Sequence, residues 1–287
     1  CGWGVLLRGD ECGEARECAL DVSELKRVRF FPPYENDIVI AGQRTNAMGK
    51  LDIMPDLDAI LVPIGGGGLI AGIATAAKAI NPSIEIYGVE SAHFNSMYAR
   101  IKGVPPTFGS VTIADGIAVK EPGKLTSKIV AELVDDIFLV EEDEIEEAMI
   151  LLLEIEKTLV EGAGAIGLAA LKKNTELFQG KKVGLILCGG NVDPLTLTAI
   201  IDKGMVKAGR LVRLNVQMTD MPGSLSEVSR IFGECNANID EVHFQRAFTL
   251  LPIQHVNVEF SLKTRDHQHV EDVILALSDH GFSASKV

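Results

Sequence analysis

Residues 59–72, Ala-Ile-Leu-Val-Pro-Ile-Gly-Gly-Gly-Gly-Leu-Ile-Ala-Gly, decide the fold of this chain. The apolar run Ile60 to Val62 predicts a buried strand, and the alanine-rich segment from Leu69 predicts a helix. Between them stand four consecutive glycines: Gly65, Gly66, Gly67 and Gly68. Glycine loses more backbone entropy on folding than any other residue, so such a run is expected where the backbone itself approaches a ligand. Unpaired N–H groups at a helix N-terminus attract anions, and the segment therefore predicts a phosphate-binding loop.

Two alternatives accompany this prediction. Gly66, Gly68 and Ala71 also match the G-x-G-x-x-G/A pattern of dinucleotide-binding loops. Glu90 closes the next apolar strand, where a ribose-binding acid would lie in such a fold. That pattern has low specificity by itself. The structural alternative is a flexible turn between a strand and a helix.

Composition limits the class of protein. The 287 residues suffice for one large domain or two medium ones, and the hydrophobic content of 47% is typical of a soluble globular protein. The net charge of −13 argues against nucleic acid and anionic membrane surfaces as partners. No apolar run has the length of a membrane span. The five cysteines lack the spacing of a metal site and suit a reducing cytoplasm, which is the predicted location.

Alternating strand and helix patterns predict an α/β fold with a mostly parallel sheet in the first two thirds of the chain. Strands are expected at 5–7, 28–31, 60–62, 84–89, 136–140 and 183–187, and helices at 14–25, 36–50, from 69, at 93–102 and at 145–159. Gly42 and Gly49 are expected to break the helix at 36–50. Ligands in such folds lie beyond the carboxyl ends of strands, where the glycines at 65–68 and 189–190 both fall.

The pattern changes after Gly209. An alternating strand from residue 210, a helix from Ser224, two further strands, a helix and a final strand give the order β-α-β-β-α-β. Ser224 and Glu227 fit a capping box at the first of these helices. Residues 210–287 are therefore predicted to form a second, ferredoxin-like domain, joined to residues 1–200 by a linker at 201–209.

The combination of motifs resembles a known family. Residues 1–200 look like part of a threonine/serine dehydratase, a pyridoxal-phosphate enzyme of the tryptophan-synthase-β type (fold type II), and residues 210–287 resemble an ACT regulatory domain. The matching segments are Gly65-Gly66-Gly67-Gly68-Leu69, Ala114-Asp115-Gly116, Glu161-Gly162-Ala163-Gly164-Ala165 and Cys188-Gly189-Gly190-Asn191-Val192-Asp193.

The resemblance implies a cofactor site and a reaction. Residues Gly65 to Leu69 would hold the phosphate of pyridoxal 5′-phosphate, Cys188 would face the pyridine nitrogen, and Gly116 would place backbone beside the ring. A thiol is a weak partner for that nitrogen, so the ring would be a moderate electron sink. The implied reaction converts L-threonine to 2-oxobutanoate, and L-serine to pyruvate, with release of ammonia. The structural alternatives are a small buried residue at Cys188 and a plain turn at Gly116.

Glu90 aligns with a cation ligand of the family. Relatives that bind a divalent ion carry a second carboxylate six positions later, and Ser96 occupies that position here. Glu90 is therefore the one candidate metal ligand, without the second carboxylate that a divalent cation has in those relatives, and a solvated strand end is the alternative.

The family's Schiff-base lysine, in a Ser-Phe-Lys motif, has no match in this sequence. Lys26, Lys50 and Lys78 stand in contexts unlike that motif. We expect the chain to be an N-terminally incomplete piece of a dehydratase, and such a piece to expose a sheet edge and aggregate. The alternative is a non-catalytic relative that senses amino acids.

The ACT resemblance implies allosteric control. The effector, a branched-chain amino acid such as isoleucine or valine, would bind at Asp220, Met221, Pro222, Gly223, Ser224 and Leu225, in a homo-oligomer, dimeric or tetrameric. The alternative enzymes are a serine racemase and a cysteine-synthase-like β-replacement enzyme.

Overall fold

The computed structural model describes residues 4–8, 12–109, 111–245 and 252–287. The chain divides into two compact units, one ending at Val192 and the other beginning at Asp193. Helix α9 (Pro194–Lys207) spans most of the segment in which a linker is expected, and its N-cap Asp193 accepts a hydrogen bond from the Thr196 N–H. None of the described helices is long and apolar enough to cross a membrane.

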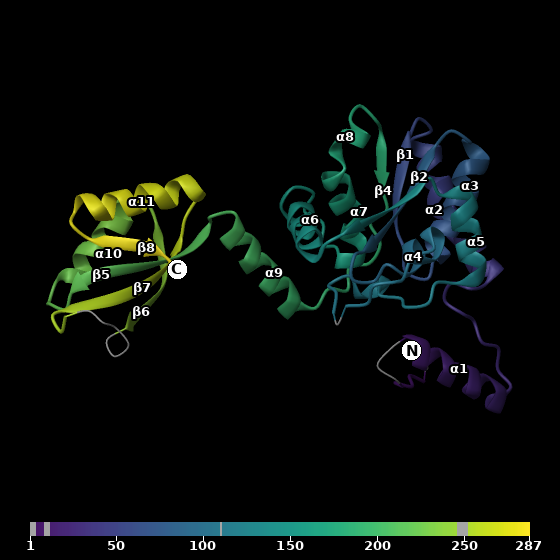
Figure 1. Ribbon diagram of the computed structural model, residues 1–287, viewed down its shortest axis with the longest axis horizontal. Coiled ribbons are helices and arrows are strands. Elements are labelled where there is room, and N and C mark those ends of the chain that lie inside the picture. Colours follow the sequence, from purple (N-terminus) through teal and green to yellow (C-terminus); the bar gives the residue numbers. More distant parts are fainter. Residues whose placement is uncertain (1–3, 9–11, 110, 246–251) are drawn as a thin grey trace. The chain divides into compact units, whose positions relative to one another are not determined.

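The first unit is built on a parallel sheet with the strand order β3-β2-β1-β4 (Figure 1). Its strands are β1 (Ala59–Pro63), β2 (Glu85–Ser91), β3 (Asp136–Val140) and β4 (Val183–Leu185). Strand β1 is buried along its whole length, as expected for an inner strand covered on both faces. The predicted α/β class and four of the predicted strands are confirmed.

Helices cover both faces of this sheet (Figure 1). Ile60 and Val62 of β1 pack into a core with α2 (Asp37–Ile53), α3 (Gly68–Ile80), α4 (Ser96–Lys102) and α5 (Lys124–Leu133). Leu61 points the other way, toward α7 (Gly162–Lys173). The remaining helices of this unit are α1 (Cys12–Lys26), α6 (Glu142–Glu154) and α8 (Thr175–Phe178), and a 3₁₀ turn covers Asp115–Ile117.

The second unit has the predicted βαββαβ order. Its antiparallel sheet runs β6-β7-β5-β8, built from β5 (Leu211–Thr219), β6 (Asn238–Gln245), β7 (His255–Lys263) and β8 (Ser283–Lys286). Helices α10 (Ser224–Glu234) and α11 (His267–Asp279) supply Phe232 and Val273 to a core shared with Phe260 of β7. This unit therefore has a hydrophobic core of its own.

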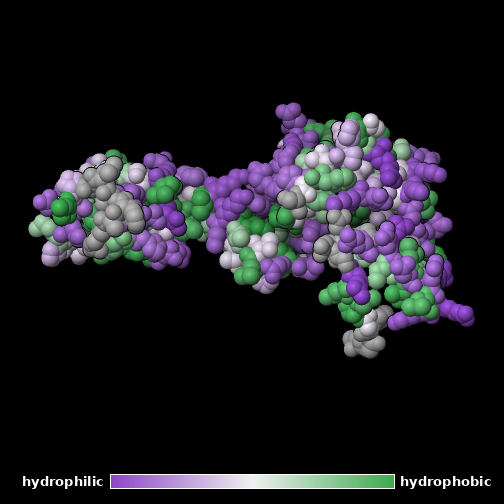
Figure 2. Space-filling view, turned by 60° about the horizontal axis from the view of Figure 1, so that its bottom comes forward, coloured by the Kyte–Doolittle hydropathy of each residue, from purple (hydrophilic) through white to green (hydrophobic). Residues whose placement is uncertain are grey.

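Several local predictions are wrong. Residues 5–7 and 28–31 form no strand, because no described strand pairs with them, and their apolar side chains stay exposed: Val5 82%, Leu7 89%, Val28 56% and Phe31 60%. Figure 2 shows hydrophobic residues, coloured green, at the surface of the molecule. Helix α2 continues through Gly42 and Gly49, and α6 ends at Glu154, before the predicted end at 159.

The capping box predicted at Ser224 is also wrong. Gly223 is the N-cap of α10, in a left-handed conformation (φ 99°) and without a side-chain cap. The Ser224 hydroxyl instead lies 3.2 Å from the Thr219 Oγ1. Helix α5, which begins at Lys124, is not among the helices predicted from the sequence.

Candidate functional site

The tetraglycine bend lies between the end of β1 and the start of α3. Gly67 is its N-terminal cap and has φ 91°, in the left-handed region that disfavours any side chain. A Cβ on Gly67 would also lie only 2.6 Å from the Met97 Cε and 2.8 Å from the Thr126 Oγ1. Glycine is therefore required at this position by both the backbone conformation and the surrounding side chains.

The backbone N–H groups of the bend find no acceptor in the part of the chain that the structure describes. Among the described residues, none of the amides from Gly65 to Leu69 donates a hydrogen bond to another group of the chain. The carbonyl of Gly66, in contrast, accepts from the Gly123 N–H (3.2 Å) and from the Thr126 hydroxyl (2.7 Å). Hydrogen bonds to the Gly66 carbonyl thus hold the bend in place, while its N–H groups stay available to a ligand. Buried unpaired N–H groups are costly, and at a helix N-terminus they form an anion site.

Tyr34 packs against this bend, which sequence reasoning did not foresee. Its ring occupies the space that a Cβ on Gly66 would need, and its hydroxyl donates to the Glu121 carbonyl at 3.2 Å. Packing against the Tyr34 ring therefore requires glycine at position 66, whether or not a ligand binds there. The only sequence pattern near Tyr34 is the Pro32-Pro33 pair that precedes it.

A cavity of about 360 Å³ opens at the bend. That volume falls in the range of small-ligand sites. It brings together Gly65, Gly66, Gly67, Gly68, Leu69, Gly116 and Cys188, all of which the sequence singled out. Its other lining residues are Pro33, Tyr34, Gln43, Pro63, Ile117, Val119, Glu161, Ala163 and Gly189. The lining, all of it described, includes no lysine.

Cys188 follows β4 and is half-buried in this cavity. Burial, and then the negative charge of Glu161, raise the pKa of its thiol above the ordinary value of 9.0. The group is therefore a neutral S–H near pH 7. A neutral thiol is a weak hydrogen-bonding partner and a poor nucleophile, which argues against a catalytic thiolate.

Glu161 is the carboxylate of the cavity, and the sequence did not single it out, although it begins the quoted Glu-Gly-Ala-Gly-Ala motif. Its N–H donates to the Gly189 carbonyl at 3.3 Å. Its Oε1 lies 3.2 Å from where a Cβ on Gly116 would be, so Gly116 lies directly beside the carboxylate. Within the described residues this carboxylate has neither a hydrogen bond nor an ion pair.

Glu90 does not line the cavity and is not a solvated strand end. It is fully buried, and its two carboxylate oxygens accept the N–H groups of Met97 (2.9 Å) and Tyr98 (2.7 Å) at the start of α4. Burial raises the pKa of Glu90 to about 7, against the lowering effect of those two bonds. Because Glu90 is fully buried outside the cavity and each of its oxygens already accepts a backbone N–H, it offers no accessible ligand for a cation and no accessible acceptor for a ribose.

Ser96, at the position of the second carboxylate in cation-binding relatives, also has a hydrogen-bond partner within the chain. The Ser96 hydroxyl donates to the Val119 carbonyl at 2.6 Å. No group of three or more His, Cys, Asp or Glu side chains suited to a metal occurs in the part of the chain that the structure describes. The described residues do not fit a divalent cation at Glu90. The dinucleotide alternative loses its acidic residue for the same reason.

The predicted effector residues lie in the second unit, at the turn between β5 and α10. Met221 is 67% exposed and Leu225 is 38% exposed. In the described part of the chain, the N–H groups of Gly223 and Leu225 have no protein acceptor. The turn therefore presents apolar side chains beside free backbone donors, which suits an amphipathic anion.

The chain is similar to proteins of known family. A family model described as pyridoxal-phosphate dependent enzyme matches residues 5–189. The L-threonine ammonia-lyase of Geobacter sulfurreducens is 43% identical over 286 residues, covering 98% of this chain and 70% of that protein.

The chain is also similar to solved structures. The processed form of threonine deaminase isoform 2 from Solanum lycopersicum is 32% identical with a TM-score of 0.65, covering 70% of this chain and 57% of that one. Maize serine racemase is 36% identical with a TM-score of 0.63, covering 72% and 64%. The chain thus spans less than two thirds of the length of these two structures.

Proposed function

The chain belongs to the family of pyridoxal-phosphate dependent enzymes, and we propose that its cavity serves the deamination of L-threonine to 2-oxobutanoate and ammonia, and of L-serine to pyruvate and ammonia. The observation that carries the proposal is the row of unpaired amides from Gly65 to Leu69, which shares one cavity with the Cys188 thiol. Similarity to an L-threonine ammonia-lyase over both units supports the choice of reaction.

The residues present fit the cofactor of the family. Buried N–H groups without acceptors, at the N-terminus of α3, provide hydrogen bonds and a favourable dipole for a phosphate. The cavity lining, as described, contains no arginine or lysine, so backbone N–H groups and the dipole of α3 would stabilise the phosphate. Gly65, Gly66, Gly67, Gly68 and Leu69 would hold the phosphate, and Gly116 would lie beside the ring.

Bound pyridoxal phosphate supplies an electron sink for loss of the α proton and then of the β hydroxyl. Cys188 would face the pyridine nitrogen with an uncharged thiol. Because burial and Glu161 both raise the pKa of that thiol, its sulfur keeps its proton at neutral pH. Such a partner does not hold a full positive charge on the ring nitrogen, which a carboxylate would favour.

Glu161 carries the one carboxylate of this lining, next to Gly116 and Gly189, and that carboxylate has no partner among the described residues. In the proposed site it has two effects. Its charge adds to the effect of burial in raising the pKa of the Cys188 thiol, and its oxygens would accept a hydrogen bond from a substrate amino or hydroxyl group. Tyr34, Ile117 and Val119 line the same cavity and would exclude water from it.

A binding titration tests the cofactor assignment. Pyridoxamine 5′-phosphate forms no covalent link with a lysine, so its affinity reports the non-covalent contacts of the cavity. We expect saturable binding, detected by quenching of ligand fluorescence, and much weaker binding of pyridoxamine, which lacks the phosphate. Equal affinity for the two compounds, or binding of neither, would remove the proposal.

A product assay tests the reaction. We expect 2-oxo acid and ammonia to form from L-threonine in the presence of pyridoxal phosphate when the family's Schiff-base lysine segment is supplied together with this chain. Serine racemisation is the second candidate, favoured by the similarity to maize serine racemase. Formation of D-serine without 2-oxo acid would favour that alternative, and similarity to an ammonia-lyase across both units favours deamination.

The second unit is proposed to be an ACT-type regulatory domain in a homo-oligomer. Its βαββαβ order and the free donors at Gly223 and Leu225 support an amino-acid effector such as isoleucine or valine. Calorimetry on the whole chain with a panel of amino acids is expected to give heat with branched-chain members, and light scattering a mass above one chain. Heat with no amino acid would remove the regulatory proposal.

The free thiols of Cys18, Cys188 and Cys235 support a cytoplasmic location.

A further inference from the structure

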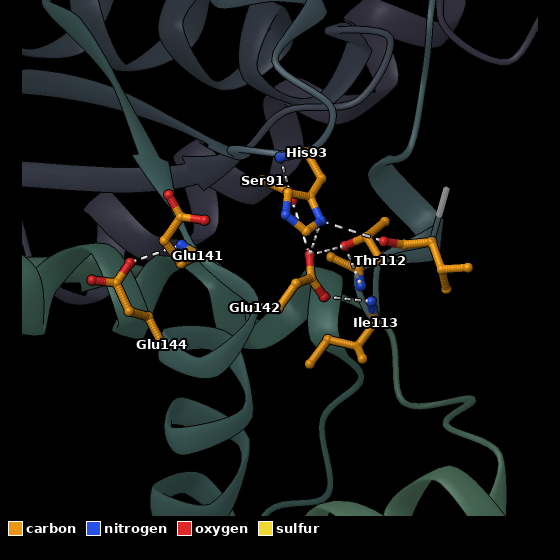
Figure 3. A network of polar contacts seen from close by, with 9 residues as sticks. Ser91, His93, Thr112, Ile113, Glu141, Glu142 and Glu144 are labelled. Atoms are coloured by element: carbon orange, nitrogen blue, oxygen red, sulfur yellow. Dashed lines mark hydrogen bonds and ion pairs between the residues drawn. The ribbon is translucent and has the colours of Figure 1, made fainter. Parts of the chain in front are cut away.

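Glu142, the first residue of α6, lies where three segments of the first unit meet (Figure 3). We propose that Glu142 is a positioning residue for the cavity: its carboxylate fixes residues 112–119, here called the wall segment, which contribute Gly116, Ile117 and Val119 to the lining. The inference rests on the proposed function for its relevance to the cofactor. Glu142 itself does not line the cavity.

The contacts of the carboxylate connect strand β2 with the wall segment. Its Oε1 accepts from the Thr112 hydroxyl at 2.6 Å and from the Ser91 hydroxyl at 3.1 Å, and its Oε2 accepts from the Ile113 N–H at 2.9 Å (Figure 3). Hydrogen bonds to an ionised acceptor are about twice as strong as neutral ones. The carboxylate therefore holds two consecutive residues of the wall segment to the end of β2.

This anchor continues into the wall segment. The Thr112 Oγ1, which donates to Glu142, accepts the Ala114 N–H at 3.2 Å, and both Thr112 and Ala114 are buried. The 3₁₀ turn begins at the next residue. Further along, the hydrogen bonds are local, from the Ile117 N–H to the Ala114 carbonyl (3.0 Å) for example, until Ser96 binds the Val119 carbonyl.

Near the same carboxylate lies His93. Its Nδ1 is 3.8 Å from the Glu142 Oε1 and 3.4 Å from the Val111 carbonyl. The backbone N–H of His93 donates to the Ser91 hydroxyl at 3.2 Å. The described polar anchors at the start of the wall segment thus converge on Glu142, directly or through its immediate partners. Loss of this one carboxylate would release Thr112, Ile113 and Ser91 together.

The wall segment lies close to the tetraglycine bend. The Ile117 Cα and the Val119 Cγ2 lie 3.1 Å and 3.2 Å from where a Cβ on Gly65 would be. At such distances a small displacement of the wall changes the space over the bend. Since catalytic and binding geometry tolerates shifts of only about 0.5 Å, loosening the wall is expected to weaken ligand binding.

Glu142 is not needed to cap its own helix. Glu141 and Glu144 form the capping box of α6, with the Glu141 N–H donating to the Glu144 Oε2 at 2.8 Å (Figure 3). Glu144 also pairs with Lys173 at 2.9 Å. Two acidic residues of one helical turn therefore have separable tasks, and Glu144→Ala is a matched control for Glu142→Ala.

The test compares Glu142→Ala, Glu142→Gln and Glu144→Ala in the whole chain. Hydrogen exchange without ligand is measured over 112–119 and over β1 and α3, with thermal unfolding and the affinity for pyridoxamine 5′-phosphate. We expect Glu142→Ala to speed exchange in the wall segment and to weaken affinity about tenfold, with β1 and α3 unchanged. Glu142→Gln is expected to restore part of both, because its carbonyl can still accept the Ile113 N–H.

The control is expected to behave in the opposite way. Glu144→Ala should lower the unfolding temperature through the lost cap and leave the wall segment and the affinity unchanged. Unchanged exchange at 112–119 in Glu142→Ala would overturn the inference, as would affinity losses that follow unfolding temperature alike in both alanine variants. If the unaltered chain binds no pyridoxamine phosphate, the proposed function fails, whereas the exchange comparison still decides whether Glu142 fixes the wall.

Discussion

Glu90 is expected to make the first unit less stable as the pH rises from about 4.5 to about 7. Burial raises the pKa of this carboxyl to about 7 in the folded chain, from the ordinary value of 4.5. Between those two values the folded state holds a proton that the unfolded state has released. Stability falls with rising pH wherever the folded state binds more protons, so this contribution is fully present below pH 4.5 and lost above pH 7.

The size of the effect follows from the shift in pKa. A change of about 2.5 units, at about 1.4 kcal/mol for each unit, corresponds to about 3 kcal/mol of unfolding free energy. Glu90→Gln removes the titration and resembles the protonated acid, because its side chain keeps a single carbonyl acceptor for the Met97 and Tyr98 N–H groups. The variant should match the unaltered chain near pH 4.5 and exceed it by about 3 kcal/mol near pH 8.

Urea unfolding over that pH range measures the difference. The three tyrosines, Tyr34, Tyr87 and Tyr98, all belong to the first unit, so their fluorescence follows the unit that contains Glu90. Subtracting the two pH profiles cancels the other titrating groups. Parallel profiles from pH 4.5 to 8 would refute the reasoning, because they would mean that Glu90 titrates alike in the folded and unfolded states.

Two further substitutions test the cavity. Gly67→Ala places a side chain at φ 91° and 2.6 Å from the Met97 Cε; we expect a loss of about 2–4 kcal/mol in urea unfolding and weaker binding of pyridoxamine 5′-phosphate, and an unchanged midpoint would contradict the strain. Glu161→Gln removes the charge that helps to raise the pKa of the Cys188 thiol; alkylation of Cys188 by iodoacetamide near pH 8 should become faster, and an unchanged rate would mean that the two groups do not interact.

The tetraglycine segment could be predicted because its structural cause is local. A buried apolar strand, a run of residues without side chains and an alanine-rich helix dictate a strand–bend–helix unit, and the structure has β1, the bend and α3 in those places. The same holds for the second unit, whose alternating strands and amphipathic helices predict the observed order. The apolar residues at 5–7 and 28–31 misled the prediction, because a strand forms only where another strand pairs with it.

Residues brought together by long-range packing were not predictable. Tyr34 reaches the bend from a segment 32 positions before Gly66, and nothing in its own neighbourhood indicates this contact. Glu90 seemed exposed because it ends a strand, but α4 folds back so that its first N–H groups reach the carboxylate. Glu142 stood within an acidic run typical of a solvated helix start, and its partners Thr112 and Ile113 come from a distant loop.

The most direct measurement follows the backbone amides of the bend themselves. In a ¹⁵N-labelled chain, pyridoxamine 5′-phosphate should shift the amide resonances of Gly65, Gly66, Gly67, Gly68 and Leu69, and pyridoxamine without the phosphate should leave them nearly unmoved. Shifts of the same size with both compounds, or shifts confined to other parts of the chain, would contradict the proposal that these donors hold the phosphate.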